Sequence, residues 1–153
     1  MHKLRIYIDT SVIGGCFDEE FQEWSNKLFE EFINGDKIAV ISDVTLEELE
    51  DAPKRVRIHL DKIPTLNKEI VLLNQEAKDL SGSYINEGIV TEKSLVDTRH
   101  IALATIHKVD ILASWNFKHI VNYNKIMLYN SVNLKLGYSI IEIRSPRELV
   151  NEN

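Results

Sequence analysis

The chain has 153 residues, a length that is typical of one domain and is sufficient to bury a hydrophobic core. Hydrophobic residues make up 44% and charged residues 27%, a balance that excludes an intrinsically disordered chain. The net charge of -6 argues against a protein that holds nucleic acid through an overall positive charge. A local basic patch, a bridging metal ion, or both would still allow such binding.

The cysteine count and the lengths of the apolar segments indicate the cellular compartment of the protein. Cys16 is the only cysteine, so the chain has no internal disulfide and no paired-cysteine zinc motif. The apolar residues before Asp9 are too few for a signal peptide, and no later segment approaches the length of a membrane span. We therefore expect a cytoplasmic protein with a single domain over residues 1–153 and no membrane contact.

The first part of the chain reads as two strands, each followed by a helix. Residues 4–8 form a short apolar strand, and residues 9–11 after it can cap a helix that Gly14-Gly15 ends early. Apolar residues then recur at helical spacing from Phe21 to Phe32, up to a stop at Asn34-Gly35. Residues 38–41 form a second strand, and Ser42-Asp43 opens a helix with apolar residues as far as Val56.

The second part of the chain continues this alternation. Apolar spacing predicts a longer helix that begins at Ile70 and ends near Gly82 or Gly88, and another helix over residues 95–109. A third strand is expected at 111–113, short helices at 116–121 and 131–136, and a fourth strand at 139–143. Alternating strands and helices predict an α/β fold with a parallel sheet covered on both faces. Ligands of such sheets bind at the carboxyl ends of the strands.

Asp9 follows the first predicted strand directly, so its carboxylate is expected at this ligand-binding edge. Two interpretations of Asp9 are open: a functional acid, or a side chain that caps the next helix. Thr10 or Ser11 can serve as the cap equally well.

Glu48 differs from its neighbour Glu47 in its place on the predicted helix. At roughly 100° per residue, Glu47 points away from the apolar face, whereas Glu48 lies on the flank of that face. From there a carboxylate can reach over the edge of the sheet. The alternatives are a capping box formed by Thr45 and Glu48, or an ordinary surface acid.

Asp97 lies in the first turn of a helix that begins near Ser94. These two residues also match the capping-box pattern, which gives Asp97 a structural explanation. A helix N-terminus nevertheless favours an ionised carboxylate, as a metal ligand requires. His100, three residues further on, lies on nearly the same face. It can bond Asp97, contact a phosphate, or be a half-buried histidine without a functional role.

Carboxylate oxygens without a histidine or cysteine cluster suit Mg²⁺ or Mn²⁺ better than Zn²⁺. Such an ion neutralises phosphate charge and activates water for in-line attack. Spacing alone leaves the structural and functional interpretations of the three acids open.

Taken in order, four segments resemble the PIN-domain family of metal-dependent ribonucleases, including its VapC-like toxins. Residues 7–15 (YIDTSVIGG) resemble the first acidic motif of that family, and residues 41–49 (ISDVTLEEL) resemble the second. Residues 97–104 (DTRHIALA) are similar to the third acidic helix, and residues 114–120 (SWNFKHI) to the segment after the next strand. The similarity extends over nearly the whole chain, through residues 141–146.

This resemblance implies a three-layer α/β/α fold, a Mg²⁺ or Mn²⁺ site and endonuclease cleavage of RNA. It implies that Asp9, Glu48 and Asp97 form the metal site, with Asn116 as a fourth site residue where many members carry an acid. An amide oxygen can bind a metal or orient a water, but it adds no negative charge; Asn116 can equally cap a short helix. Family members are often neutralised by an antitoxin protein and usually form homodimers.

Two functional hypotheses follow from these observations. The first is a Mg²⁺- or Mn²⁺-dependent endoribonuclease. Its RNA substrate can contact the basic stretch from Lys54 to Lys62, and the alternative for this stretch is a solvated helix face without a functional role. The second is a catalytically weak PIN-like module that binds RNA or a protein, with Asn116 marking the loss of activity. Cleavage of RNA that depends on metal distinguishes the two.

Overall fold

A five-stranded sheet lies at the centre of the fold in the computed structural model, which describes residues 2–150. The strand order is β3-β2-β1-β4-β5, and every adjacent pair is parallel. The strands are β1 (Arg5–Ile8), β2 (Ile38–Ser42), β3 (Lys68–Val71), β4 (Ile111–Ala113) and β5 (Glu142–Arg144). The central strands are almost entirely buried, as expected for a parallel sheet with both faces covered.

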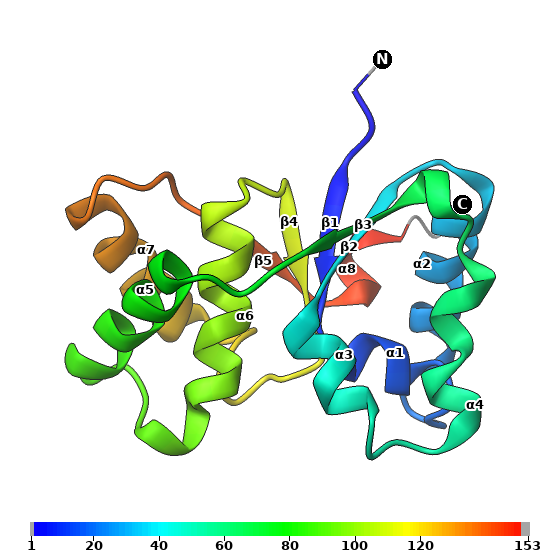
Figure 1. Cartoon of the computed structure of the whole chain (residues 1–153), viewed down its shortest axis with the longest axis horizontal. Coiled ribbons are helices and arrows are strands. Elements are labelled where there is room, and N and C mark those ends of the chain that lie inside the picture. Colours follow the sequence, from blue (N-terminus) through cyan, green and yellow to red (C-terminus); the bar gives the residue numbers. More distant parts are fainter. Residues whose placement is uncertain (1, 151–153) are drawn as a thin grey trace.

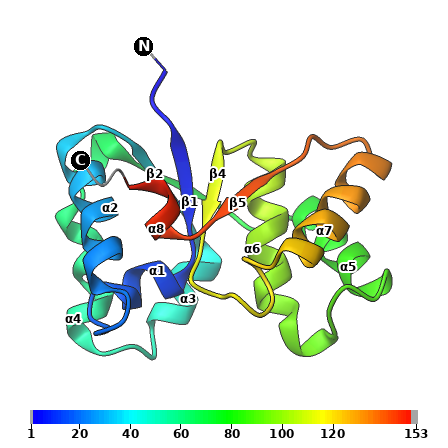
Figure 2. The same ribbon diagram turned by 180° about the vertical axis from the view of Figure 1, so that it is seen from behind.

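Helices cover both faces of this sheet, as Figures 1 and 2 show from opposite sides. One group contains α5 (Gln75–Asn86), α6 (Leu95–Ile106) and α7 (Tyr123–Lys135). The other contains α1 (Thr10–Gly15), α2 (Gln22–Asn34), α4 (Lys54–Arg57) and α8 (Pro146–Leu149), with α3 (Asp43–Leu49) between the groups. Short 3₁₀ helices lie at His59–Lys62, Thr65–Asn67 and Glu92–Ser94. Among the described residues, none of the helices combines the length and apolar character that crossing a membrane requires.

Each face of the sheet has its own hydrophobic core, because side chains alternate along the strands. Tyr7 and Leu112 belong to the core shared with α5, α6 and α7. Ile6 and Ile8 belong to the opposite core, together with the apolar residues of α1 and α2. The predicted three-layer α/β architecture is confirmed.

The helix predicted from Ile70 to Gly82 or Gly88 was wrong in its first part. Lys68–Val71 forms the edge strand β3, and the helix begins only at Gln75, where the Asn74 side chain caps it by accepting from the Ala77 N–H. Ile70 is 57% exposed, so it does not belong to the buried face of a helix. An edge strand pairs with only one neighbouring strand, so it is less completely buried than a central strand. In the sequence, a single exposed apolar residue in such a strand resembles the start of a helical apolar pattern.

Other boundaries also differ from the predictions. Residues 116–121 form turns instead of a short helix, and the predicted helix at 131–136 is the end of the longer α7. The helix expected from Ser42 to Val56 is divided into α3 and α4, because Pro53 lies between them. The last strand is shorter than predicted, at Glu142–Arg144, and α8 after it was not predicted.

Candidate functional site

Polar residues of three central strands meet at the carboxyl edge of the sheet. Asp9 follows β1, and Ser114 follows β4, which pairs with β1. The Asp9 carboxylate accepts hydrogen bonds from Ser11 Oγ and Ser114 Oγ, both at 2.6 Å, and from the Val12 N–H at 3.3 Å. Asp9 is therefore both the N-cap of α1 and a buried acid at the ligand-binding edge, so the two interpretations of this residue are compatible.

The surroundings of Asp9 disfavour its negative charge. Burial raises the pKa of this carboxyl, although the charge of His100 and the Ser11 and Ser114 hydroxyl groups act in the opposite direction. Only 5% of the residue is exposed to solvent. A cation bound beside Asp9 would therefore compensate a charge that the protein alone compensates incompletely.

Glu48 turns from α3 towards this edge. Its Oε1 atom accepts hydrogen bonds from Thr10 Oγ1 and His100 Nε2, both at 2.7 Å. Burial alone would raise the pKa of Glu48, but the hydrogen bond and charge of His100 and the Thr10 hydroxyl outweigh it and lower the pKa. The capping-box alternative is wrong, because α3 is capped by Ser42, which accepts from the Thr45 N–H.

His100 connects Glu48 to the centre of the fold. Its side chain is 2% exposed, and its Nδ1 atom lies 2.6 Å from the Tyr7 hydroxyl, which lies 2.6 Å from Ser42 Oγ. The charge of His100 also acts on both Asp9 and Asp97. His100 therefore lies among all three acids, a role that the sequence analysis left undecided. Its spacing of three residues from Asp97 was the only signal for it.

Asp97 lies in the first turn of α6, where it is partly buried. Burial raises its pKa and the Glu48 charge adds to this, against the lowering effects of His100, His119 and a hydrogen bond with the Asn116 side chain. Ser94 stands at the N-cap of α6 but makes no side-chain capping hydrogen bond. The capping-box alternative for Asp97 is therefore wrong as well.

Asn116 shapes the turn that follows β4. Its Oδ1 atom accepts hydrogen bonds from the backbone N–H groups of Lys118 at 3.2 Å and His119 at 2.9 Å. The oxygen thus caps a turn, and the Asn116 side chain also lowers the pKa of the Asp97 carboxylate. His119 was missed as a neighbour of this site, and its Nδ1 atom is buried without a hydrogen-bond partner among the described residues.

The donor set fits a hard divalent cation in its chemistry. It consists of carboxylate oxygens, and the surroundings raise the pKa of two of the three acids, Asp9 and Asp97, so they disfavour the charged form of both. Within residues 2–150, however, no three side chains of the metal-binding types lie close enough together to hold an ion as they stand. Any ion would have to draw the carboxylates together or bind some of them through water.

Comparison with solved structures gives the fold a family context. A FitAcB structure from Neisseria gonorrhoeae matches with a TM-score of 0.60 at 14% identity, over 94% of this chain and 99% of that chain. VapBC2 from Rickettsia felis, bound to a promoter DNA fragment, matches with a TM-score of 0.59 at 13% identity, over 93% of this chain and 98% of that one.

VapC20 from Mycobacterium tuberculosis, described as a Sarcin-Ricin loop cleaving toxin, matches with a TM-score of 0.57 at 12% identity, over 74% and 91% of the two chains. The chain has a VapC-like PIN fold. By sequence alone, neither a protein-family model nor a curated protein matches it. In this VapC-like fold, Asp9 lies at the carboxyl end of β1, and Glu48 reaches the same edge from α3, where it bonds Thr10.

Proposed function

We propose that the protein is an endoribonuclease that depends on Mg²⁺ or Mn²⁺. The observation that carries the proposal is that the buried His100 bonds Glu48 and that its charge acts on Asp9 and Asp97, although these three acids are separated by 39 to 88 residues in sequence. The printed description of VapC20 as a toxin that cleaves the Sarcin-Ricin loop supports the proposal by analogy.

Each acid would have its own part in the reaction. Asp9 and Asp97 would hold the ion, and Glu48 would complete the site directly or through water. When bound, the ion supplies neutralisation of the phosphate charge and activation of the attacking water. Glu48 Oε1 is occupied by Thr10 and His100, which leaves Oε2 to accept a hydrogen bond from that water. Asn116 would assist by keeping Asp97 in place.

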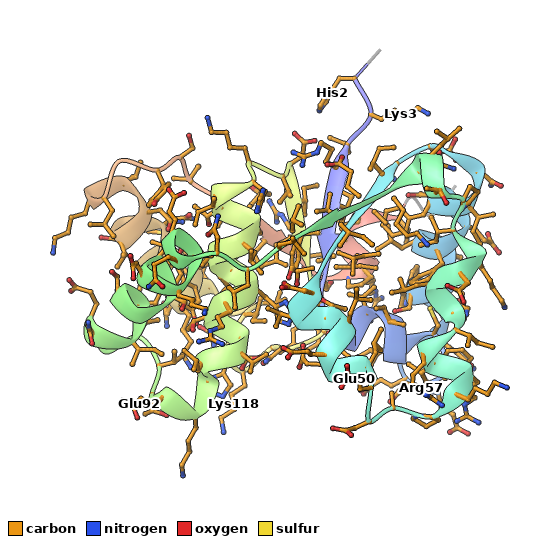
Figure 3. The ribbon with its side chains drawn as sticks, in the orientation of Figure 1. His2, Lys3, Glu50, Arg57, Glu92 and Lys118 are labelled. Atoms are coloured by element: carbon orange, nitrogen blue, oxygen red, sulfur yellow. The ribbon has the colours of Figure 1, made fainter. Side chains whose placement is uncertain are left out.

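The RNA backbone would contact the basic stretch from Lys54 to Lys62. Arg55 and Lys62 line a pocket of about 460 Å³ together with Phe17, and the Arg55 guanidinium lies 5.6 Å from the centre of the Phe17 ring. In Figure 3, Arg57 and Lys118 lie at the end of the molecule opposite His2 and Lys3, the end towards which β1 runs. Figure 3 places Glu92 and Glu50 at this end too, so the cations there would act as local contacts for a polyanion in a mixed charge pattern.

A protein partner also belongs to the proposal. One similar structure, from Klebsiella pneumoniae, is described as a toxin–antitoxin complex. VapBC2 from Rickettsia felis and VapBC from Salmonella typhimurium are described as bound to DNA. We propose that an antitoxin neutralises this protein and that the protein forms a homodimer in the cytoplasm, where the thiol of the buried Cys16 stays reduced. A small gene next to this one that inhibits the nuclease when co-expressed would support the toxin role. Light scattering of the purified protein measures its oligomeric state.

The decisive experiment is cleavage of generic single-stranded RNA by the purified protein with Mn²⁺, with Mg²⁺ and with EDTA. We expect cleavage with either metal, none with EDTA, and none by the Asp97→Asn variant. Absence of cleavage by the wild-type protein under all conditions would favour the second candidate, a binding module without activity. Two observations favour this candidate: the capping role of Asn116, and the lack of a preformed three-ligand group in the part of the chain that the structure describes.

A further inference from the structure

A pocket of about 390 Å³ opens beside the candidate metal site, on the side of α1. Two of the residues that line it, Ser11 and Asn116, act directly on the proposed metal ligands Asp9 and Asp97. A nucleotide whose phosphate lay at the acids would therefore have the pocket within reach of its base. The rest of the wall comes from Gly14, Gly15, Asp18, Phe21 and Trp115.

One wall of this pocket is aromatic and fixed in position. The rings of Phe21 and Trp115 are stacked, with centroids 4.2 Å apart and an angle of 18° between their planes. Trp115 Nε1 donates to Ser25 Oγ at 2.8 Å, which in turn donates to the Val12 carbonyl. A rigid aromatic surface binds planar groups at a low cost in conformational entropy.

Two glycines, Gly14 and Gly15, contribute to the lining of the pocket, and they differ in the space around them. A Cβ atom built on Gly14 would meet no heavy atom within 4 Å, apart from its own helix and chain neighbours. Gly15 is different: a Cβ atom there would come within 2.6 Å of Ser25 Oγ and 2.7 Å of Trp115 Nε1. Gly15 is thus required by the packing of Trp115, whereas Gly14 keeps space free.

The charge of the pocket excludes a phosphate and selects for hydrogen-bond donors. Asp18 brings a carboxylate, and Glu19 and Glu20 follow it. Asp18 Oδ1 accepts from the Glu20 N–H at 2.8 Å, and the carboxylate forms no ion pair within residues 2–150. An occupant that supplies N–H groups would satisfy it. The amino groups of guanine, adenine and cytosine do so, whereas uracil presents its one N–H between two carbonyl oxygens that a carboxylate repels.

We propose that this pocket binds the base of an RNA nucleotide next to the cleaved phosphodiester and prefers a base that carries an exocyclic amino group. The inference rests on the proposed ribonuclease function and adds a base preference to it. The base would lie against the Phe21–Trp115 wall, and its amino group would donate to Asp18. Recognition of unstacked bases by aromatic side chains and by their hydrogen-bonding edges is the usual way in which proteins read single-stranded RNA.

Two substitutions test the pocket, each with a matched control. Gly14→Leu fills the pocket, and Gly82→Leu is its control, because Gly82 is also helical and its Cβ would also meet open space. Asp18→Asn keeps an oxygen that can accept from the Glu20 N–H, but it removes the negative charge and replaces the second carboxylate oxygen with an NH₂ donor. Glu19→Gln removes the same charge from the neighbouring exposed residue, which does not line the pocket.

Binding is measured by fluorescence anisotropy with oligouridine and with oligouridine carrying one central guanosine, adenosine or cytidine, in EDTA and in Ca²⁺. The wild-type protein should bind the three substituted strands several-fold more tightly than oligouridine. Gly14→Leu should weaken their binding about tenfold, or roughly 1.4 kcal/mol, within the usual range for one stacked base. Asp18→Asn should remove the preference for amino-bearing bases, and both controls should behave like the wild type.

The outcomes separate the base pocket from the nuclease function. Suppose that the wild type cleaves RNA but binds all four strands with the same affinity, or that Asp18→Asn leaves its base preference unchanged. Either result would overturn the base pocket and leave the nuclease proposal standing. Base-selective binding without any metal-dependent cleavage would overturn the nuclease proposal and leave the pocket standing. Tight binding of a short arginine-containing peptide that depends on Asp18, without any base preference, would assign the pocket to a protein partner and overturn the inference.

Discussion

Asp97 carries its carboxylate in surroundings that raise its pKa, first through burial and then through the charge of Glu48. The folded protein therefore disfavours the charged form, so Asp97→Asn should leave the metal-free protein equally stable or make it more stable. Mn²⁺ should raise the melting temperature of the wild type by mass action but not that of the variant. Differential scanning fluorimetry with and without Mn²⁺ measures both effects.

The control for this experiment is Glu92→Gln, which removes an exposed acid shortly before α6 and should keep the Mn²⁺ effect. Loss of folding in Asp97→Asn would contradict the prediction and return Asp97 to a structural role.

Asn116 has two tasks that can be separated by substitution. Asn116→Ala removes the oxygen that caps the N–H groups of Lys118 and His119, so it should cost about 1 kcal/mol of unfolding free energy. It should reduce RNA cleavage only modestly. Asn116→Asp keeps the acceptor and adds a charge next to Asp97, so Mn²⁺ should bind more tightly by ~1 kcal/mol. Urea unfolding and calorimetric titration measure the two effects; unchanged metal affinity in Asn116→Asp would remove this residue from the site.

Tyr7 supports Glu48 through His100, and Tyr7→Phe tests that support. Loss of the hydroxyl leaves His100 Nδ1 and Ser42 Oγ without their partner in a buried region, at a cost of about 1–3 kcal/mol. Mn²⁺ affinity should fall as well, because His100 then holds Glu48 less firmly. Tyr84→Phe is the matched control: its hydroxyl is also buried, but it bonds Asn133 in the core beneath α5 and α7. It should lose stability and keep its metal affinity.

At the level of residues, the sequence predicted which side chains to examine but not their contacts. Asp9 and Glu48 were predicted at the sheet edge from their places after a strand and on a helix flank. His100 was left as an undecided neighbour, because its partners Tyr7 and Glu48 lie 93 and 52 residues away. Hydrogen bonds between residues so far apart in sequence depend on the order of the strands in the sheet. The periodicity of apolar residues along the sequence does not predict that order.

Among the structural elements, β1 is tied to β3 across β2 by one ion pair. Arg5 Nε and Nη2 donate to the Glu69 carboxylate at 2.9 and 3.0 Å, and the hydrogen bond from Arg5 is the first cause of the lowered pKa of Glu69. A carboxylate with a lowered folded pKa stabilises the protein above its ordinary pKa, and this stabilisation is lost as the pH falls through the folded pKa.

Glu69→Gln should therefore destabilise the protein at neutral pH by less than about 1 kcal/mol, because both partners are partly exposed. The difference from the wild type should vanish in acid, below the pH at which the wild-type carboxyl is protonated. Urea unfolding over this pH range measures the effect, with the exposed Glu47→Gln as control. A difference that stays constant with pH would show that the ion pair contributes nothing.

The elements that the sequence predicted best are those with a strong local pattern. The central strands and the helix of residues 95–106 are buried along most of their length, and their apolar runs make this visible. The turn after β4 was taken for a helix because Asn116 resembles an N-cap. Its oxygen does cap backbone N–H groups, but tertiary packing ends the segment as a turn before Asn122 caps α7.

The whole molecule consists of two hydrophobic cores that share one sheet. Ile13 lies in the core with α1 and α2, Ile101 lies in the core with α5 and α6, and both are fully buried. Ile13→Val and Ile101→Val should each cost about 1 kcal/mol, and the double variant should lose the sum within ~0.5 kcal/mol. Urea unfolding of the three variants measures this. A loss well above the sum would mean that strain passes through the sheet from one core to the other.

The central position of β1 has a consequence for the time at which the site forms. Ile6 pairs with Ala39 on one side and with Ile111 on the other, so the second pairing closes a loop of about a hundred residues. Such a closure is entropically costly and comes after the more local contacts. Before it, Asp9 lacks its hydrogen bond from Ser114. During synthesis the growing chain would thus expose β1 and β2 long before it held a complete set of acids. The proposed nuclease would therefore stay inactive on the ribosome until the strand that ends at Ala113 has emerged and paired.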